Sequence, residues 1–476
     1  MSQPDARFPA EIRKLAAQLV RDEPALLSSL GFGPYVRQGC GTGPTLLIGD
    51  QSEIHLLASR PASRLDHRMA LLARPGDMVV VRKREPDFEG YLADYLGLTD
   101  LDFIAAPGDG QTPVAAQLRW SDDLLDRCAA LAGAQGGLTL TAYITSGNLW
   151  RLAQAIGARA QCPVHVNGPS PRTAQRANDK LWFANLARRV IGRDAVPPTL
   201  SAYGPAAAAA LVARIGRQAG QVIVKIPDSA GSIGNVRLLR DDLGDMPLPT
   251  LRRFLIARLH ALGWQDIYPL LVGVWDSGVT RSPSAQLWIP LPDDGPPRLQ
   301  GVFEQSLRGE NAAFVGAQRT VLPGGLHQRF ATEALRIADV LQRSGYFGRC
   351  SFDAVICDDG SGQDVIHWIE CNARWGGVSI PMTALHRIAA GSETRALLIM
   401  QETLMRKPVP TAAIVTLLDD LMFRAGRTDA GLVMMSPPPQ QADGLPLNLA
   451  AMAGSEDDAA RMMQTAIARI LAAPDA

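Results

Sequence analysis

His367 to Gly377 read "HWIECNARWGG", and polar and apolar residues alternate along this stretch. Glu370, Asn372 and Arg374 occupy every second position, and the residues between them are apolar. Alternate side chains of a β-strand point to opposite faces of the sheet. The pattern therefore predicts a strand with one apolar face and one face that carries a carboxylate, an amide and a guanidinium. The alternative is an exposed strand whose polar face lies in water.

A partner strand for this stretch lies just upstream. The segment "SFDAVI" (351–356) is followed by the glycine- and aspartate-rich loop "CDDGSGQD" (357–364), which predicts a β-hairpin. A turn centred between Ser361 and Gly362 places Asp353 opposite Glu370. Two opposed carboxylates destabilise a sheet unless a cation lies between them. With Asn372 as a further oxygen ligand the group suits Mg²⁺, although a slipped register or an exposed acidic pair is the alternative.

Two lysines add to this picture. In "VIVKIPDSAGSIGNV" (222–236), Lys225 lies on an apolar strand and therefore needs an anionic partner if it is buried. The glycine-rich loop after it offers backbone N–H groups that can fold over phosphates. Lys180, in the helical stretch "NDKLWFANLARRV" (178–190), is a second cation. For both lysines a solvated side chain at the surface is the alternative.

The N-terminal third predicts a different kind of sheet. Apolar runs at 45–49, 77–83, 101–106, 138–145 and 163–168 alternate with amphipathic stretches, which is typical of an open, largely parallel α/β sheet. The cluster "GCGTG" (39–43) precedes a strand, so it is a turn and not a dinucleotide-binding loop. Residues 171–192 predict one long helix. Beyond it, the strands at 267–275, 284–291 and 299–307 are expected to be antiparallel.

The composition excludes several classes of protein. Lys plus Arg and Asp plus Glu both number 47, so no global field favours nucleic acid or an anionic membrane. The 476 residues, 47% of them apolar, predict several domains. The 6 cysteines are scattered, and five of them flank or lie within apolar runs, which predicts buried thiols. The start of the chain does not look like a signal peptide, and no apolar run is long enough to span a bilayer. We expect a cytoplasmic protein without nucleic-acid or membrane partners.

The order of these features is the basis of a family resemblance. A helical lysine, a strand lysine with a glycine-rich loop, antiparallel strands and an Asp…Glu-x-Asn-x-Arg pattern resemble the ATP-grasp fold of carboxylate–amine ligases, over residues 170–405. The resemblance implies a chain of the α/β and α+β classes. Its expected parts are a Rossmann-like pre-ATP-grasp domain (1–169), a first ATP-grasp subdomain with a flap (170–265), a second subdomain with the metal site (266–407) and a small C-terminal subdomain (408–476).

The resemblance also implies roles for individual residues. Asp353, Glu370 and Asn372 would bind Mg²⁺, Lys180 and Lys225 would contact the phosphates of ATP, and Lys225 and Arg374 would act in catalysis. The flap would be "AGSIGNV" (230–236), with Ser229, Gly231, Ser232, Ile233 and Gly234 binding the nucleotide. The backbone of Val272 and Val274 would bind adenine. The sequence departs from the family pattern at the hinge after these valines, where no glutamate follows until Glu304. Asp276 is the remaining candidate for the ribose contact.

The implied activity is an ATP-dependent ligation. A small-molecule carboxylate would be activated as an acylphosphate and joined to an amine, an amino acid or a peptide. The stretches "AYITSGNLWRLAQAIG" (142–157) and "NGPSPRTAQRANDKLWF" (167–183) look most like the peptide ligase of pheganomycin biosynthesis and its relatives. The alternatives are an ATP-grasp kinase, an acid–thiol ligase and a nucleotide-binding regulator without turnover. The sequence does not indicate the donor, the acceptor or the oligomeric state.

Overall fold

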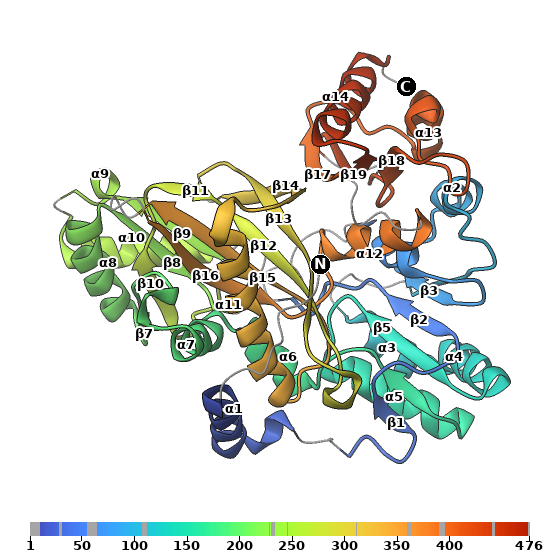
Figure 1. Cartoon of the computed structure of the whole chain (residues 1–476), viewed down its shortest axis with the longest axis horizontal. Helices are drawn as coiled ribbons and strands as arrows, with labels where there is room; N and C mark the ends of the chain where they lie inside the picture. Colours follow the sequence, from blue (N-terminus) through green and yellow to red (C-terminus); the bar gives the residue numbers. More distant parts are fainter. Residues whose placement is uncertain are drawn as a thin grey trace.

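The computed structural model describes residues 10–27, 31–54, 64–106, 112–227, 229, 234–244, 246–310, 312–358, 363–389, 396–439 and 443–474. Its strands form three sheets, one parallel and two antiparallel, which follow one another along the chain (Figure 1). Gly231, Ser232 and Ile233, which were predicted to belong to the flap, lie outside the described residues.

The first sheet has six parallel strands in the order β1-β6-β5-β2-β3-β4. The elements of this part are α1 (Ala10–Asp22), η1 (Pro24–Leu26), β1 (Val36–Gln38), β2 (Thr45–Ile48), η2 (Arg64–Leu72), β3 (Met78–Val81), α2 (Pro86–Leu96), β4 (Asp102–Ala105), α3 (Val114–Trp120), α4 (Asp122–Gln135), β5 (Leu138–Ala142), α5 (Gly147–Ala160) and β6 (Val164–Val166). Leu46 and Ile48 pack toward α3, α4 and α5, and Leu47 packs toward η2 and α2. Both faces of the sheet are therefore covered, as a parallel sheet requires.

The predicted parallel sheet is confirmed, with two differences. All five expected strands form, but β1 was not predicted because three residues give no clear pattern. The stretch at 64–72 is a 3₁₀-helix, η2, where an amphipathic helix was expected. Gly49 explains how η2 lies on the end of β2, since a Cβ at Gly49 would collide with the backbone of Asp66. The "GCGTG" segment is the connection between β1 and β2.

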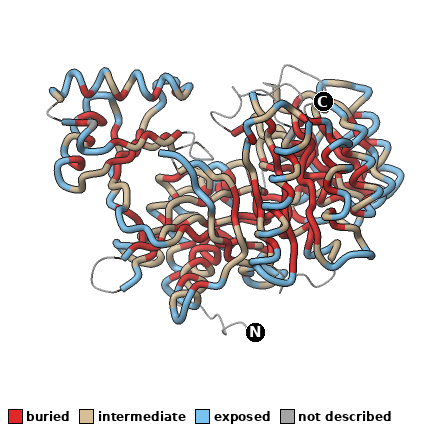
Figure 2. Tube along the Cα trace, turned by 90° about the horizontal axis from the view of Figure 1, so that it is seen from above, coloured by how far each residue is buried: buried red, intermediate tan, exposed pale blue. Residues whose placement is uncertain are grey.

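The second sheet belongs to a small lobe that lies apart at the left of Figures 1 and 2. It has four antiparallel strands in the order β7-β10-β8-β9. Its elements are β7 (Thr199–Ala202), α8 (Pro205–Ala219), β8 (Gln221–Lys225), β9 (Asn235–Leu239), α9 (Arg240–Leu243), α10 (Leu248–Ala261) and β10 (Leu270–Val274). Helices α8 and α10 pack on the sheet and form a separate core with it, which includes Val212, Leu255 and Val272.

The predicted long helix at 171–192 is wrong, because it is two helices, α6 (Pro171–Asn178) and α7 (Lys180–Val190). Asp179 between them has an extended backbone, and its carboxylate accepts hydrogen bonds from the backbone N–H groups of Leu181 and Trp182. Aspartate is a preferred N-cap residue, so it starts a new helix inside an otherwise helical pattern. The break puts Lys180 at the first position of α7, where its side chain is buried.

The third sheet has nine antiparallel strands and forms the middle of the molecule. Its elements are β11 (Val279–Arg281), β12 (Pro283–Ile289), η4 (Pro292–Asp294), β13 (Arg298–Arg308), β14 (Ala313–Thr320), α11 (Gly324–Arg343), β15 (Gly348–Asp358), β16 (Asp364–Asn372), α12 (Ser379–Ile388), β17 (Ala396–Leu404), α13 (Thr411–Leu417), η6 (Asp419–Leu421), β18 (Gly431–Met434), β19 (Leu445–Ala453) and α14 (Glu456–Ala472); a 3₁₀-turn, η3 (Arg193–Ala195), precedes β7. The expected antiparallel strands are confirmed.

The C-terminal residues extend this sheet instead of forming one of their own. Strand β17 pairs with β14 on one side and with β19 on the other, and β18 follows at the edge. The core under these strands continues into the N-terminal domain, where Phe88 and Tyr91 of α2 belong to it. The predicted C-terminal subdomain therefore shares both a sheet and a core with earlier parts of the chain.

Two expectations from composition have structural counterparts. All 6 cysteines are free, and 5 of them are buried, with Cys40 exposed. Among the described residues, no helix combines the length and the apolar character needed to cross a lipid bilayer.

Candidate active site

All three sheets line one cavity of about 1310 Å³. The parallel sheet contributes residues at the carboxyl ends of its strands, among them Asp50 and Tyr143. The small lobe contributes Lys225 of β8, and the large sheet contributes Asp353 and Glu370. A cavity of this size exceeds the usual volume of a site for one small ligand, about 300–1,000 Å³. It has room for more than one substrate.

The β15–β16 hairpin places the predicted acidic pair as expected. Asp353 lies directly opposite Glu370, and Ser351 lies opposite Asn372. Between the acidic pair and the loop, the predicted register is wrong by one residue. Ala354 pairs with Trp368 and not with Ile369, because the register shifts between Asp353 and Ala354. This β-bulge absorbs the extra residue and leaves the acids on one face. The Asp353 carboxylate accepts hydrogen bonds from Ser284 Oγ at 2.6 Å and from Asn372 Nδ2 at 2.8 Å.

The two lysines approach the hairpin from different elements. Lys180 Nζ of α7 lies 3.2 Å from Glu370 Oε2 and also donates hydrogen bonds to the backbone oxygen and to Oγ of Ser229. Lys225 points from β8 into the same cavity. Among the described residues, no carboxylate lies within ion-pair distance of Lys225 Nζ. The structure therefore brings both predicted lysines and both acids together, at a place where Lys225 has an unmatched charge.

Burial and mutual charge shift the ionisation of these groups. Burial, with the Glu370 carboxylate adding to it, raises the pKa of Asp353 to about 6. Burial also opposes the ionisation of Glu370, but Lys180, Arg374 and Lys225 outweigh it and hold its pKa below the usual value. Burial lowers the pKa of Lys225 to about 8, partly offset by Glu370. Burial thus makes the charged forms of Asp353 and Lys225 unfavourable. A divalent cation beside the two carboxylates, and an anion beside the lysines, would stabilise these charged forms.

Arg374, just after the end of β16, is held in place by Asn178, a residue that was not predicted from the sequence. Asn178, the last residue of α6, accepts hydrogen bonds through Oδ1 from Arg374 Nη1 and from the backbone N–H of Ala373, both at 2.9 Å. Arg374 Nε is buried without a partner among the described residues. The guanidinium is thus fixed on one edge and has donor capacity left on the other. The "ND" break between two helices was the available signal for Asn178.

The described ends of the flap lie next to these lysines. Ser229 Oγ donates to the backbone oxygen of Ile226 at 2.8 Å, and the backbone N–H of Ile226 bonds the oxygen of Gly234 at 2.9 Å. A Cβ at Gly234 would collide with Ser229 Oγ, so glycine permits this close approach. Lys180 therefore connects the base of the flap to Glu370.

The two valines expected at adenine, Val272 and Val274, lie in different surroundings. Strand β10 is an interior strand, so Val272 faces β7 on one side and β8 on the other, and its side chain is fully buried in the lobe core. Val274 does line the cavity, followed by Trp275 and Asp276. Its backbone N–H already bonds the oxygen of Pro198 at 3.0 Å. The cavity-facing part of this segment is therefore its C-terminal end.

Asp276 belongs to a cluster at the cavity rim. Its carboxylate lies 3.0 Å from His367 Nδ1, and Cys357 is close enough that the three possible ligand atoms lie within 4.8 Å of one another. Burial, with Asp276 adding to it, raises the pKa of the Cys357 thiol to about 11, so the thiol stays protonated at neutral pH. The contact with His367 therefore orients the carboxylate of Asp276.

The sequence reasoning missed the polar residues of two neighbouring strands. Ser284, Gln286 and Gln305 line the cavity from β12 and β13. Gln286 Nε2 donates to Ser284 Oγ at 2.9 Å, and Ser284 in turn bonds Asp353. The alternation of polar and apolar residues in "SAQLWI" (284–289) is the same signal that identified the hairpin.

The comparisons with known proteins support the fold that this geometry suggests. A family model described as the pre-ATP-grasp domain matches residues 66–158. No protein among the curated sequences matches the chain.

Solved structures extend the comparison to nearly the whole chain. The biotin carboxylase domain of Hydrogenobacter thermophilus 2-oxoglutarate carboxylase, in complex with MgADP, ADP and bicarbonate, is 14% identical (TM-score 0.52) and covers 89% of each chain. The ADP complex of Staphylococcus aureus N5-carboxyaminoimidazole synthetase is 12% identical (TM-score 0.51) and covers 92% of this chain and 100% of that one. The Aspergillus clavatus N5-carboxyaminoimidazole synthase, with ADP and aminoimidazole ribonucleotide, is 14% identical (TM-score 0.51) and covers 90% and 98%. The chain therefore has a pre-ATP-grasp domain followed by an ATP-grasp fold, as predicted.

Proposed function

We propose that this protein is an ATP-dependent carboxylate–amine ligase, which activates a carboxylate as an acylphosphate and joins it to the amine of an amino acid or peptide. The observation that carries the proposal is the meeting of Asp353, Glu370, Lys180, Lys225 and Arg374 in one cavity. Phosphoryl transfer requires acidic residues that bind a metal ion and cations that stabilise the phosphate charge. Both kinds of group lie in this cavity, and they come from three separate stretches of chain. The peptide-type substrate and a role in natural-product biosynthesis are part of the proposal, from the similarity to pheganomycin-type ligases.

The residues fit a nucleotide and a magnesium ion. Asp353, Glu370 and Asn372 offer the oxygen donors that Mg²⁺ prefers, and burial together with the Glu370 carboxylate raises the pKa of Asp353 to about 6. Lys180 and Lys225 would contact the nucleotide phosphates, since the buried Lys225 ammonium forms no ion pair among the described residues and therefore favours an anion, and Lys180 adds a second positive charge near it. When bound, Mg²⁺ would neutralise negative charge on the phosphate oxygens. ADP in the neighbouring structures is consistent with this assignment.

The chain's own groups can support both halves of the reaction. A substrate carboxylate would attack the γ-phosphorus of ATP and ADP would leave, with Lys225 stabilising the transferred phosphoryl group. The amine would then attack the carbonyl carbon of the acylphosphate, and phosphate would leave as the amide forms and the amine loses its proton. Arg374 would stabilise the tetrahedral oxyanion through the donors that Asn178 does not occupy.

A phosphate-release screen tests this function. Purified protein with MgATP is offered a panel of acids, including bicarbonate, in combination with amino acids and dipeptides as amines. We expect ADP and phosphate only when an acid and an amine are both present, together with an amide product by mass spectrometry. A stable phosphorylated product without an amine requirement would identify a kinase, and thioester formation would identify an acid–thiol ligase. Nucleotide binding without ADP release across the panel would identify a regulator.

A further inference from the structure

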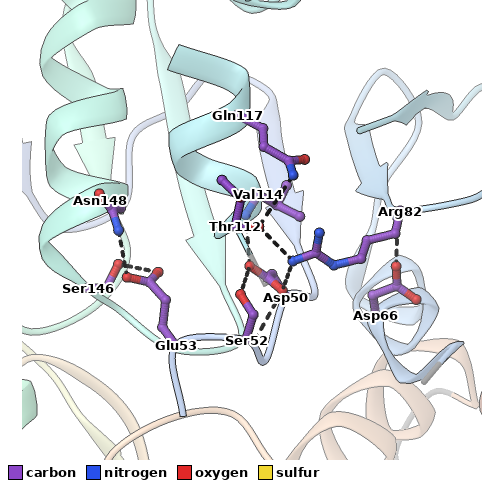
Figure 3. A network of polar contacts seen from close by, with 10 residues as sticks. All are labelled: Asp50, Ser52, Glu53, Asp66, Arg82, Thr112, Val114, Gln117, Ser146 and Asn148. Carbon is purple, nitrogen blue, oxygen red and sulfur yellow. Dashed lines mark hydrogen bonds and ion pairs between the residues drawn. The ribbon is translucent and has the colours of Figure 1, made fainter. Parts of the chain in front are cut away.

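The other end of the cavity is the carboxyl edge of the parallel sheet, and an ordered polar network holds it in place (Figure 3). Asp50, after β2, accepts hydrogen bonds from Arg82 Nη2 at 2.9 Å and from the backbone N–H of Val114 at 2.8 Å. Glu53 accepts hydrogen bonds from Ser146 and Asn148 at 2.6 and 2.9 Å. The Arg82 charge is therefore neutralised by Asp50, and the loops at this edge are tied together.

Arg68, on η2 at the same edge, has no such neutralisation. The residue is 3% exposed, yet it lines the cavity. Among the described residues, its guanidinium donates one hydrogen bond, from Nη2 to Gln401 Oε1 at 2.8 Å, and Nε is buried without a partner. Asp66, the nearest acid in sequence, is engaged by His67 and by the backbone N–H of Arg82. Burial lowers the pKa of Arg68 to about 10, with Tyr143 opposing it, so the side chain remains charged at neutral pH.

Burial of an arginine is not by itself a sign of a ligand, and Arg349 shows why. It is also buried without a carboxylate partner among the described residues. Its guanidinium lies over the rings of Trp288 and Trp375, at 5.5 and 5.1 Å from their centroids, and bonds Thr383 Oγ1 at 3.0 Å. Aromatic faces and hydroxyl oxygens compensate that cation. Arg68 has neither an aromatic face nor a carboxylate within the described structure, and it faces the cavity that Arg349 does not line.

The position of Arg68 relates it to the reaction. A Cβ placed on Gly377 would lie 3.6 Å from Arg68 Nη1 and 3.6 Å from Gln401 Oε1. Gly377 closes the short loop that begins at Arg374, so Arg68 is beside the segment that carries the proposed oxyanion donor. Because η2 packs directly against Gly49, Arg68 lies close to Gly377. The cavity wall here is formed jointly by the N-terminal domain and by β17.

We propose that Arg68, with Gln401 and Tyr143 beside it, binds a free carboxylate of the amine substrate, namely the carboxylate of an amino acid or peptide acceptor. The proposal rests on the ligase function above. A planar guanidinium with unused donors on two edges matches the two oxygens of one carboxylate. A single unmatched cation also matches one negative charge, whereas a phosphate monoester carries close to two. An acceptor without a carboxylate would leave Arg68 buried and unpaired, so the site would select against it.

The test compares acids with their carboxamides. Each amino acid of the panel and its carboxamide, for example L-alanine and L-alaninamide, is measured by calorimetric binding to the protein with MgADP, and by phosphate release. We expect the best acid to bind about 10- to 100-fold more tightly than its amide, as for one charge-assisted hydrogen-bonded pair. Arg68→Gln should remove this preference, and Arg68→Lys should retain part of it. Arg349→Gln is the matched control, a buried arginine whose loss should leave the preference intact.

Stability separates a binding role from a structural one. Arg68→Met should unfold at the wild-type temperature or above it, since it removes a buried cation that the free protein does not compensate. Arg349→Met should unfold at a lower temperature. The proposal is overturned if acid and amide bind equally to the wild type, or if Arg68→Gln keeps the preference. Binding preference without phosphate release for any pair would sink the ligase function while supporting the carboxylate site, so the two failures can be told apart.

Discussion

The two ends of the cavity manage charge in different ways. At the hairpin end, Asp353 and Glu370 face each other, and Lys180 forms an ion pair with one of them at 3.2 Å. At the parallel-sheet end, Asp50 neutralises Arg82, while Arg68 has a neutral amide as its described hydrogen-bond partner. The hairpin end therefore has charges of both signs within reach of one another, whereas at the sheet end the Arg68 guanidinium has no carboxylate within ion-pair distance among the described residues.

The difference teaches what each end can bind. Interleaved carboxylates and ammonium groups can hold a cation and polyphosphate together, because each new charge meets one of opposite sign. A guanidinium without an ion-pair partner suits a ligand with one negative charge. The two ends meet near Arg374, where the bond between donor and acceptor would form. Substitutions at the two ends should therefore affect different steps.

The largest effect is expected at the hairpin. Glu370→Gln keeps the shape of the side chain but removes the carboxylate charge that pairs with Lys180. Loss of a metal-binding carboxylate costs several kcal/mol of transition-state stabilisation, so turnover should fall by about 10³-fold. Asp364→Asn, an exposed acid on the same strand, is the matched control and should retain normal turnover. Equal rates for Glu370→Gln and the wild type, measured by ADP release in Mg²⁺, would contradict the assignment.

Arg374 lies between the two ends and should affect chemistry more than binding. Arg374→Ala should bind ATP normally but form product about 10²- to 10³-fold more slowly, as for the loss of an oxyanion donor. Calorimetry with ATP and single-turnover product formation separate the two quantities. A parallel loss of ATP affinity would place Arg374 on the nucleotide instead.

The lysines should affect nucleotide affinity. Lys225→Met fills the same space without a charge, and the dissociation constant for ATP should rise by about 10- to 100-fold, as for one charged hydrogen bond. Lys14→Met, on the exposed face of α1, is the control. The acid-over-amide preference set by Arg68 should be unaffected by Lys225→Met. Unchanged ATP affinity would place the nucleotide elsewhere.

The smallest effect concerns the stability of the metal-free protein. The folded pKa of Asp353 is about 6 against an ordinary value of 3.8, so folding favours its protonated form. Its contribution to stability is therefore present below about pH 4 and is lost as pH rises through about 6. Relative to Asp353→Asn, the free energy of unfolding of the wild type should fall over this range. Mg²⁺ should reduce the fall, and a flat difference between pH 4 and 7 would contradict the opposed pair.

The sequence predicted the parts of this molecule whose signals are local. Period-two alternation identified the β15–β16 strand pair, and the glycine-rich loop length placed Asp353 opposite Glu370. The β-bulge next to Asp353 shifts the register between the acidic pair and the loop but leaves the acidic pair itself in register. No local sequence pattern predicted this bulge. Asp179 ended a helix whose periodicity continued through it, because an N-cap competes with helix propensity residue by residue.

The missed residues depend on contacts between distant segments. Asn178 contacts Arg374 only because α6 packs near it, 196 positions away in sequence. Arg68 meets Gln401 across 333 positions, through the packing of the first domain on β17. The interior position of Val272 could not be predicted, because an apolar hinge strand and an apolar interior strand have the same pattern.

Transfer of an oxygen atom tests the central claim most directly. The acid that supports phosphate release is labelled with heavy oxygen in its carboxylate, and the released phosphate is examined by mass spectrometry after a single turnover. Formation of an acylphosphate between the two ends of the cavity predicts that one labelled carboxylate oxygen appears in the phosphate and that the amide retains the other. If the amide forms as fast as phosphate is released but the phosphate carries no label, the carboxylate does not attack the γ-phosphorus. That result would contradict the account.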